Sequence, residues 1–231
     1  MTRPPLWEQS VTYGAVGATR AADLLEYPPA GYRPLERRVR IGHGEDRWRH
    51  AWSQTLSWGI QRRSGFRVRV DEAPAEVSEA TYIPVGYDEA GQPVAPAAVE
   101  GAGEAAFGPE GESLIRPGDS ARLGIPVWPI RFDFPARVVY VVDEPDRKGF
   151  AYGTLPGHAE EGEEAFLVSR GGDGSVWVTI RAFSRPAGWW WLLAPALRIA
   201  QAYYTSRYLR ALMGPIPGQA AEGGGRREVT A

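Results

Sequence analysis

The sequence predicts an α+β protein in which a curved antiparallel β-sheet packs against one long C-terminal helix. Three observations support this fold class: β-prone segments with short turn-rich connections between residues 120 and 183, a helical repeat of apolar residues after Pro195, and nine tryptophans within a chain that is 43% hydrophobic. The tryptophans carry large apolar areas that need an interior to bury them. A chain of 231 residues can form one such core, so we expect a single domain over residues 1–214.

The N-terminal part is predicted to hold one edge strand and one helix. The β-like run from Ser10 to Tyr13 is followed by turn signals, so the chain up to about Arg40 is expected to be a strand and a connecting loop. From Gly42 to Arg63, acidic residues at the start and arginines at the end are typical of a helix. Trp48 and Trp52 share one face of this helix and are expected to be buried against the sheet.

A half-buried strand and an irregular segment come next. The sequence FRVRV alternates, with Phe66, Val68 and Val70 on one face. From about residue 71 to 112, Pro, Gly, Ala and Glu dominate, which is typical of a long acidic loop or a small hairpin excursion.

The remaining segments predict an antiparallel meander followed by the long helix. The expected strands are 120–125, 130–143, 149–155, 164–170 and 176–183, joined by turns such as EPDRKG and GGDG. Pro195 is expected to end a first short turn region, and an amphipathic helix then runs to about Met213. Residues 215–231 are rich in Pro and Gly and are expected to form a disordered tail. The buried stripe of the helix is predicted to be Leu197, Ala200, Tyr204, Tyr208 and Ala211.

Composition removes several classes of function. The formal net charge of −2 gives no overall attraction for nucleic acid. The absence of cysteine removes disulfides, thiolate nucleophiles and cysteine zinc sites. The N-terminus lacks the apolar run of a signal peptide, and the apolar stretch 189–200 is too short to cross a bilayer. We therefore expect a cytoplasmic protein with no transmembrane segment, and the oligomeric state stays open.

Three segments together resemble a known family. They are VTYGAVGATR near the start, IGHGEDRWRHAWSQTLSW, and ARVVYVVDEPDRKGFAYGTLPGHAEEGEEAFLV. On these segments the chain is similar to the bacterial and plant family catalogued as domain of unknown function nineteen-ninety. The resemblance spans residues 6–212, and its most specific part is GFAYGTLPGH followed by GEEAF.

The order of predicted elements is also similar to the helix-grip fold of START and pollen-allergen-like proteins. This resemblance implies an apolar cavity between the sheet and the last helix, suited to a hydrophobic or amphipathic small molecule. One departure is that the N-terminal helix is predicted as a single element where many relatives have a pair. Strand order and the aromatic stripe predict these lining residues: Trp52, Tyr140, Tyr152, Phe166, Leu197, Tyr204 and Tyr208.

Only one of the three histidines is a candidate for chemistry. His43 lies beside a glycine turn and His50 on the expected solvent side of the helix, and their spacing does not form a metal box. His158 lies in GHAEEGEE, where carboxylates close behind it would allow divalent-cation binding or general-base catalysis. The alternative is a solvated acidic hairpin loop. No cofactor and no metal are predicted.

Strand alternation selects one glutamate of that loop. Glu164 shares a face with Phe166 and Val168, whereas Glu163 is expected to point outward. A carboxylate on an apolar face needs a partner, because leaving it unpaired costs several kcal/mol. The candidates for that partner are Arg137, Arg181, Tyr140 and Tyr152.

Three hypotheses for function follow. The first is a binding protein for a hydrophobic or amphipathic small molecule. The second is an enzyme on a hydrophobic substrate that uses His158 and Glu164 as acid and base groups. The third is an interaction module that dimerises through the Trp189 to Trp191 cluster, because three consecutive tryptophans cannot all face one side of a helix. No phosphate-binding glycine loop or hydrolase triad is present in the sequence.

Overall fold

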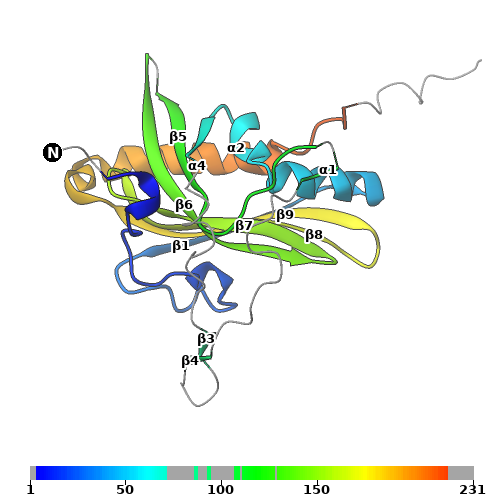
Figure 1. The fold of residues 1–231 in the computed structure, drawn as a ribbon, viewed down its shortest axis with the longest axis horizontal. Coiled ribbons are helices and arrows are strands. Elements are labelled where there is room, and N and C mark those ends of the chain that lie inside the picture. Colours follow the sequence, from blue (N-terminus) through cyan, green and yellow to red (C-terminus); the bar gives the residue numbers. More distant parts are fainter. Residues whose placement is uncertain are drawn as a thin grey trace, which may run out of the picture.

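The fold is a seven-stranded antiparallel sheet with helices on one face and an extended N-terminal segment on the other (Figure 1). The computed structural model describes residues 4–71, 86–87, 93–94, 107–109, 111–127 and 129–217. Most of the predicted acidic excursion lies outside these residues. Within it, β3 (Gly86–Tyr87) pairs with β4 (Pro93–Val94). The predicted tail beyond residue 217 also lies outside them.

The meander is confirmed. Strands β5 (Ser120–Val127), β6 (Ile130–Glu144), β7 (Arg147–Thr154), β8 (Glu160–Arg170) and β9 (Ser175–Pro186) pair successively and antiparallel. β2 (Arg67–Asp71) adds to β5, so the sheet order is β1-β9-β8-β7-β6-β5-β2. Short turns join these strands because antiparallel neighbours need only a tight connection.

The predicted first strand is wrong. Residues 10–13 form no strand, and the first strand is β1 (Arg33–His43), which lies at the sheet edge beside β9. Residues 10–13 instead cross the sheet, where the Thr12 backbone N–H donates to the Thr154 carbonyl oxygen at 3.0 Å. β1 is rich in arginine because one side of an edge strand faces solvent.

The predicted single N-terminal helix is also wrong, because the structure contains a pair. α1 (Glu45–Thr55) and α2 (Gly59–Arg63) are separated by Trp58, whose φ of 62° lies in the left-handed region. A non-glycine residue adopts this conformation only where its surroundings fix it. The Trp58 ring supplies that constraint by packing edge-on to Phe150 at 4.9 Å between centroids.

The C-terminal helix forms as predicted, but it is not amphipathic. A 3₁₀ turn, η3 (Gly188–Leu193), leads into α4 (Ala194–Arg210), and Pro195 occupies the first turn of α4. Tyr208 and Thr205 are buried on the sheet side, whereas Ala200 of the predicted stripe is exposed. The outer face also carries apolar side chains, including Ile199 and Tyr203. Among the described residues, no helix is long and apolar enough to span a membrane.

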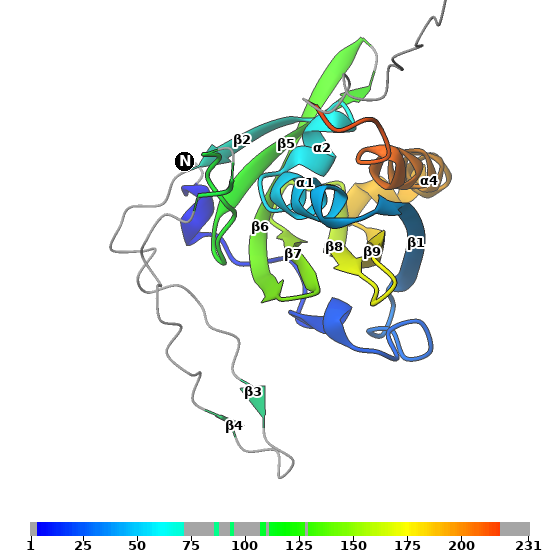
Figure 2. The same cartoon turned by 90° about the vertical axis from the view of Figure 1, so that its right-hand side faces the viewer.

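The sheet separates two apolar layers (Figure 2). On one face, α1, α2 and α4 cover a core that includes Trp48, Phe150, Phe166 and Tyr208. On the other face, the N-terminal segment with η1 (Leu6–Glu8) and η2 (Ala18–Arg20) covers two smaller clusters. The predicted ligand site should lie on the sheet face that α4 covers. The aromatic and carboxyl side chains described below lie on this face.

Candidate functional site

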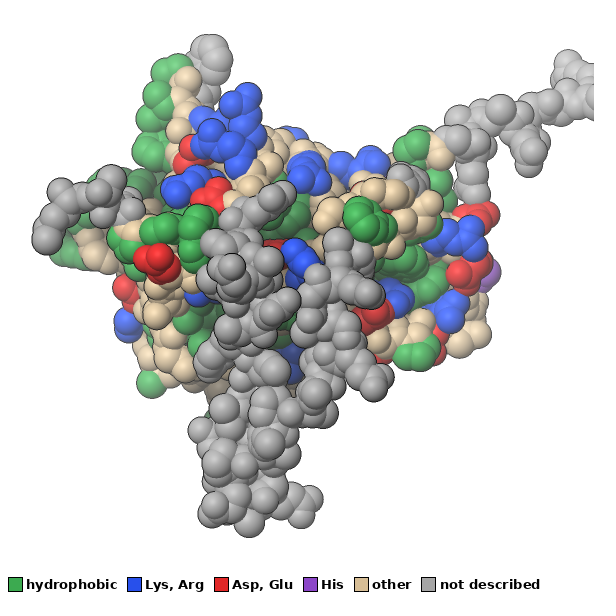
Figure 3. All heavy atoms as spheres, in the orientation of Figure 1, with side chains coloured by type: hydrophobic (Ala, Val, Ile, Leu, Met, Phe, Trp, Pro, Cys, Tyr) green, Lys and Arg blue, Asp and Glu red, His purple; other side chains and the backbone are tan. Residues whose placement is uncertain are grey.

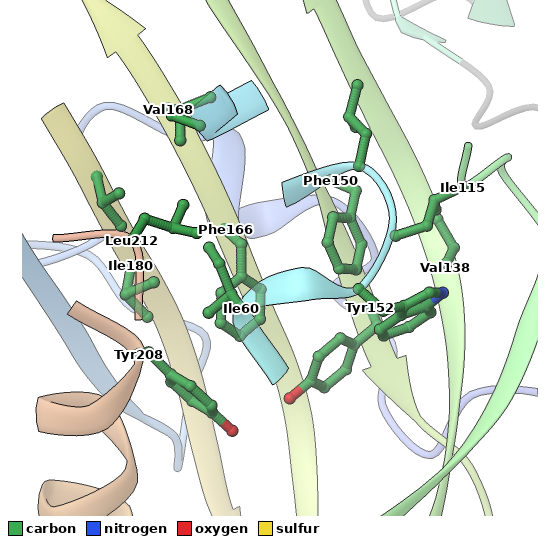
Figure 4. Close-up of a cluster of buried hydrophobic side chains, with 14 of the residues drawn as sticks. Ile60, Ile115, Val138, Phe150, Tyr152, Phe166, Val168, Ile180, Tyr208 and Leu212 are labelled. Atoms are coloured by element: carbon green, nitrogen blue, oxygen red, sulfur yellow. The ribbon is translucent and has the colours of Figure 1, made fainter. Parts of the chain in front are cut away.

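Aromatic rings fill the deep part of the space between sheet and helix (Figure 4). Phe166 lies at the centre, with ring centroids 5.7 Å from both Phe150 and Tyr152 and 5.1 Å from Tyr208. These four side chains are at most 5% exposed. The predicted lining residues Tyr152, Phe166 and Tyr208 are therefore brought together, and they pack against one another.

A half-buried carboxyl group lies at the edge of this aromatic cluster. Glu164 on β8 accepts a hydrogen bond from the Tyr152 hydroxyl at 2.5 Å, which confirms one of the four predicted partners. Burial raises the pKa of Glu164 from 4.5 to about 7, and the Tyr152 hydrogen bond acts in the opposite direction. The Tyr208 hydroxyl points toward that of Tyr152 in Figure 4. Burial raises the pKa of both tyrosines well above 10, so both hydroxyls stay protonated.

A second carboxyl group lies on the same face of β8, four residues earlier. Burial raises the pKa of Glu160 from 4.5 to about 7. Its Oε1 atom accepts from the Ser184 hydroxyl at 3.3 Å, and Ser184 Oγ accepts from the Gln201 amide at 3.2 Å. Glu160 and Glu164 repel each other when both are charged, and this contributes to the raised pKa of Glu164.

Glu160 also lines a pocket of about 110 Å³ between the end of the sheet and the start of α4. The lining combines polar groups with the apolar side chain of Leu197, one of the predicted ligand-binding residues. The pocket therefore has an amphipathic wall. We call its position, at the open end of the space between the sheet and α4, the mouth of the grip. Its lining residues are Gly31, Arg33, Glu160, Ser184, Arg185, Pro186, Ala194, Leu197, Arg198 and Gln201.

His158 lies in the loop before β8 and does not project into bulk solvent. It is half-buried, and its ring centroid is 4.9 Å from that of Phe134. Burial lowers its pKa from 6.5 to about 4, so the ring is neutral near neutral pH. Its Nδ1 atom accepts from the Glu160 backbone N–H at 3.0 Å, which leaves the ring proton on Nε2 as a donor.

Sequence reasoning missed the role of the neighbouring Glu163. Its side chain is on the opposite face from Glu164, as expected, but it is only 2% exposed because the N-terminal segment covers it. It accepts from Tyr13 Oη at 2.8 Å, from the Gly17 N–H at 2.7 Å, and from both the N–H and the hydroxyl of Thr19. The side chains of these two adjacent acidic residues therefore lie on opposite faces of the sheet and contact different partners.

Tyr140 was predicted to line the cavity, but it lies on the far side of the sheet. Its hydroxyl is 2.7 Å from Thr19 Oγ1, and the Arg20 guanidinium lies 4.0 Å above its ring. A register shift between Val138 and Tyr140 puts Val139 and Tyr140 together in the cluster under the N-terminal segment. Such a bulge inverts the alternation that the prediction used.

The other predicted residues lie around the rim or apart from the site. Trp52 and Tyr204 are partly buried against the core, and the Tyr204 hydroxyl donates to the Pro126 carbonyl oxygen at 2.9 Å. His50, predicted to face solvent, is only 7% exposed. His43 is exposed, and its Nε2 lies 2.7 Å from the Asp173 carbonyl oxygen. The described residues contain no group of three or more His, Asp or Glu side chains able to hold a metal ion.

The family-specific residues GEEAF supply Glu163, Glu164 and Phe166 of these environments. Comparison with known families covers most of the chain. The model of the family named Domain of unknown function (DUF1990) matches residues 12–105 and 103–211. The chain belongs to this family. That assignment brings no reaction with it.

Two curated relatives are similar over part of their length. A UPF0548 protein of Deinococcus radiodurans is 61% identical over 51 residues, which are 22% of this chain and 26% of the relative. The UPF0548 protein At2g17695 of Arabidopsis thaliana is 34% identical over 86 residues, which are 34% of this chain and 42% of the relative. The aligned regions thus span less than half of either relative.

Solved structures with a similar arrangement have low sequence identity. The hypothetical protein jhp0584 of Helicobacter pylori is 10% identical with a TM-score of 0.45, covering 92% of this chain and 97% of that one. Ara h 8.0201 is 8% identical with a TM-score of 0.41, covering 80% and 100%. A norcoclaurine synthase mutant of Thalictrum is 8% identical with a TM-score of 0.40, covering 81% and 98%.

Proposed function

We propose that this protein binds a compact amphipathic molecule, or one end of a longer one, at the mouth of the grip between β8, β9 and α4. The observation that carries the proposal is the enclosed carboxyl group of Glu160 in a pocket with an apolar wall, with a second enclosed carboxyl group, Glu164, four residues further along the same strand. Small-molecule sites combine apolar walls with a few convergent polar groups in this way.

The polar side of the pocket is arranged to orient a ligand. Gln201, Ser184 and Glu160 form a chain of hydrogen bonds that ends on a carboxyl group. With pKa values of about 7, Glu160 and Glu164 can each donate or accept a hydrogen bond near neutral pH. A ligand with a basic or hydrogen-bonding head would stabilise their charged forms and lower both pKa values.

The apolar side sets the size of the ligand. The pocket of about 110 Å³ is well below the roughly 300 to 1,000 Å³ that drug-sized ligands occupy. Because Tyr152, Phe166 and Tyr208 pack against one another, the deep interior acts as a floor rather than a chamber. The binding site is therefore proposed to start at Leu197 and Glu160, with the aromatic rings beneath it.

A matched pair of tryptophan substitutions on α4 tests this proposal. Leu197→Trp fills the pocket, whereas Ile199→Trp adds the same ring to a position that is 73% exposed on the same helix. Native mass spectrometry of gently purified protein should show a bound small molecule in the wild type and in Ile199→Trp but not in Leu197→Trp. Equal retention by both variants, or no bound molecule in any of them, would contradict the proposed site.

The raised pKa of Glu164 supports a second candidate, an enzyme that uses this carboxyl group as an acid or base. A catalytic group is most effective when its pKa is near the working pH, and Glu164 meets this condition. His158, which is neutral with a free Nε2 donor, would hold the substrate rather than take a proton.

The two candidates differ in what happens to the bound molecule. When the molecule recovered from Glu164→Gln is incubated with wild-type protein, an enzyme converts it to a product distinguishable by NMR, and fresh Glu164→Gln does not. If the molecule is unchanged by the wild type, catalysis on it is excluded and binding alone remains.

A further inference from the structure

The outer face of η3 and α4 carries large apolar side chains that nothing in the described structure covers. Trp189 and Trp191 are 61% and 65% exposed, and Ile199 is 73% exposed. Figure 3 shows hydrophobic side chains in green at the left end of the molecule, where Figure 1 draws the gold and orange segment that leads into α4. We call this set the apolar end; its members are Trp189, Trp191, Leu192, Leu193, Ile199 and Tyr203.

The predicted exposure of at least one tryptophan is thus confirmed. Among the described residues, only the middle ring has an aromatic contact with the sheet. Trp190 packs edge-on against Phe132 and Phe134 of β6, with centroids 6.1 and 6.2 Å apart. Trp189 stacks on Trp190 at 4.4 Å. The contact of Trp190 with β6 fixes η3 in place, so the neighbouring rings are presented outward.

The chain segment that carries the apolar end has charges of one sign. From residue 184 to 217 the sequence contains four arginines, at 185, 198, 207 and 210, and no Asp or Glu. Among the described residues, no ion pair involves Arg198, Arg207 or Arg210. Exposed tryptophan and leucine favour the interface of a bilayer, and arginine without an acidic partner is attracted to anionic lipid.

We propose that the apolar end is a docking surface for an anionic lipid membrane, with α4 lying along the interface. Trp and Tyr are the side chains that favour the headgroup region, and Leu and Ile bury below them. Arginine adds attraction for anionic lipid of roughly 1 kcal/mol for each residue near the surface. A second copy of the chain fits less well, because a two-fold contact through this face would bring the arginines of both copies together.

The apolar end adjoins the pocket but does not depend on it. Ala194, Leu197 and Arg198 line the pocket from the same helix. Membrane docking would therefore place the mouth of the grip close to the lipid. The proposal concerns a different surface from the proposed ligand site, and either can fail without the other.

Vesicle binding by the full chain tests the proposal. Co-sedimentation with phosphatidylcholine vesicles that contain phosphatidylglycerol should recover the protein, with less recovery on phosphatidylcholine alone and at high salt. The double variant Trp191→Ser with Leu192→Ser should lower the partition coefficient at least about tenfold, because membrane binding scales with buried apolar area.

A matched control separates docking from a general loss of apolar surface. Leu25→Ser with Tyr27→Ser removes two similarly exposed side chains from the N-terminal segment and should leave vesicle binding unchanged. Circular dichroism melting curves confirm that each variant is folded. The proposal is overturned if the wild type fails to bind vesicles, if both double variants lose binding equally, or if light scattering shows a wild-type dimer that Trp191→Ser with Leu192→Ser converts to a monomer.

Discussion

Two adjacent glutamates on β8 have opposite environments. Glu163 lies under the N-terminal segment and accepts four hydrogen bonds from Tyr13, Gly17 and Thr19. Glu164 lies on the gripped face and accepts one, from Tyr152, among the described residues. Both are in the family-specific segment, so sequence position alone does not distinguish them.

The difference separates a structural carboxylate from a candidate functional one. Four donors offset the cost of burying a charge, so Glu163 holds the N-terminal segment on the sheet. One donor does not offset that cost at Glu164, and its pKa rises to about 7. A buried polar group left partly unsatisfied is typical of a functional site, whereas a fully satisfied one is typical of the scaffold.

The largest expected effect on stability comes from Glu163, which accepts four hydrogen bonds. Glu163→Gln replaces one acceptor oxygen by an amide donor facing other donors, so the free energy of unfolding should fall by about 3 to 5 kcal/mol. Urea denaturation measures this change. The control, Glu161→Gln, removes the partner of the half-exposed Arg185 and should cost less than about 1 kcal/mol. Equal losses from the two variants would refute the structural role of Glu163.

The second effect is a change in how stability depends on pH. The pKa of Glu164 is raised in the folded state. Between pH 4.5 and about pH 7, the folded state therefore holds a proton that the unfolded state has released. Stability from this group is therefore present at low pH and lost as pH rises through that range. His158, whose folded pKa is lowered to about 4, acts oppositely between 4 and 6.5 and is unchanged by the substitution below.

Glu164→Gln removes the titration of Glu164 and its repulsion of Glu160. From about pH 5 to about pH 8, the free energy of unfolding of the variant should therefore rise by up to about 3 kcal/mol relative to that of the wild type. One unit of pKa corresponds to about 1.4 kcal/mol. Urea denaturation at both pH values measures the difference. A relative stability that is independent of pH would show that Glu164 titrates normally.

The smallest effects compare the two tyrosine donors. Tyr13→Phe removes one donor from the charged Glu163 and should cost about 1.5 kcal/mol. Tyr152→Phe, measured at about pH 5 where Glu164 is protonated, should cost less than about 1 kcal/mol. The comparison uses urea denaturation of both variants under the same conditions. A larger loss from Tyr152→Phe than from Tyr13→Phe would contradict the contrast between the two faces.

The sequence predicted the parts of the fold that depend on local pattern. Alternation and glycine turns located the five strands from 120 to 183, and Pro195 located the start of α4. Alternation also placed Glu164 and Phe166 on the gripped face and identified Tyr152 as a partner.

The failures have tertiary causes. The strand Arg33–His43 carries arginines rather than a clean apolar alternation because it forms the sheet edge. Gly59, directly after Trp58, fits the three- and four-residue spacing of one helical face, so it did not signal the break between α1 and α2. The bulge that moves Tyr140 to the other face inserts one residue without a signal in the alternation. The donors around Glu163 lie about 145 residues away in the chain, so only the folded structure brings them together.

The most direct test of the contrast between the two carboxyl groups is a carbon-13 NMR titration of the Glu164 side chain, assigned by comparison with Glu164→Gln. An enclosed carboxyl group at the edge of the aromatic cluster should titrate with a pKa of about 7. A pKa near 4.5 would mean that water solvates this group freely, and the proposed site would lose the feature on which it depends.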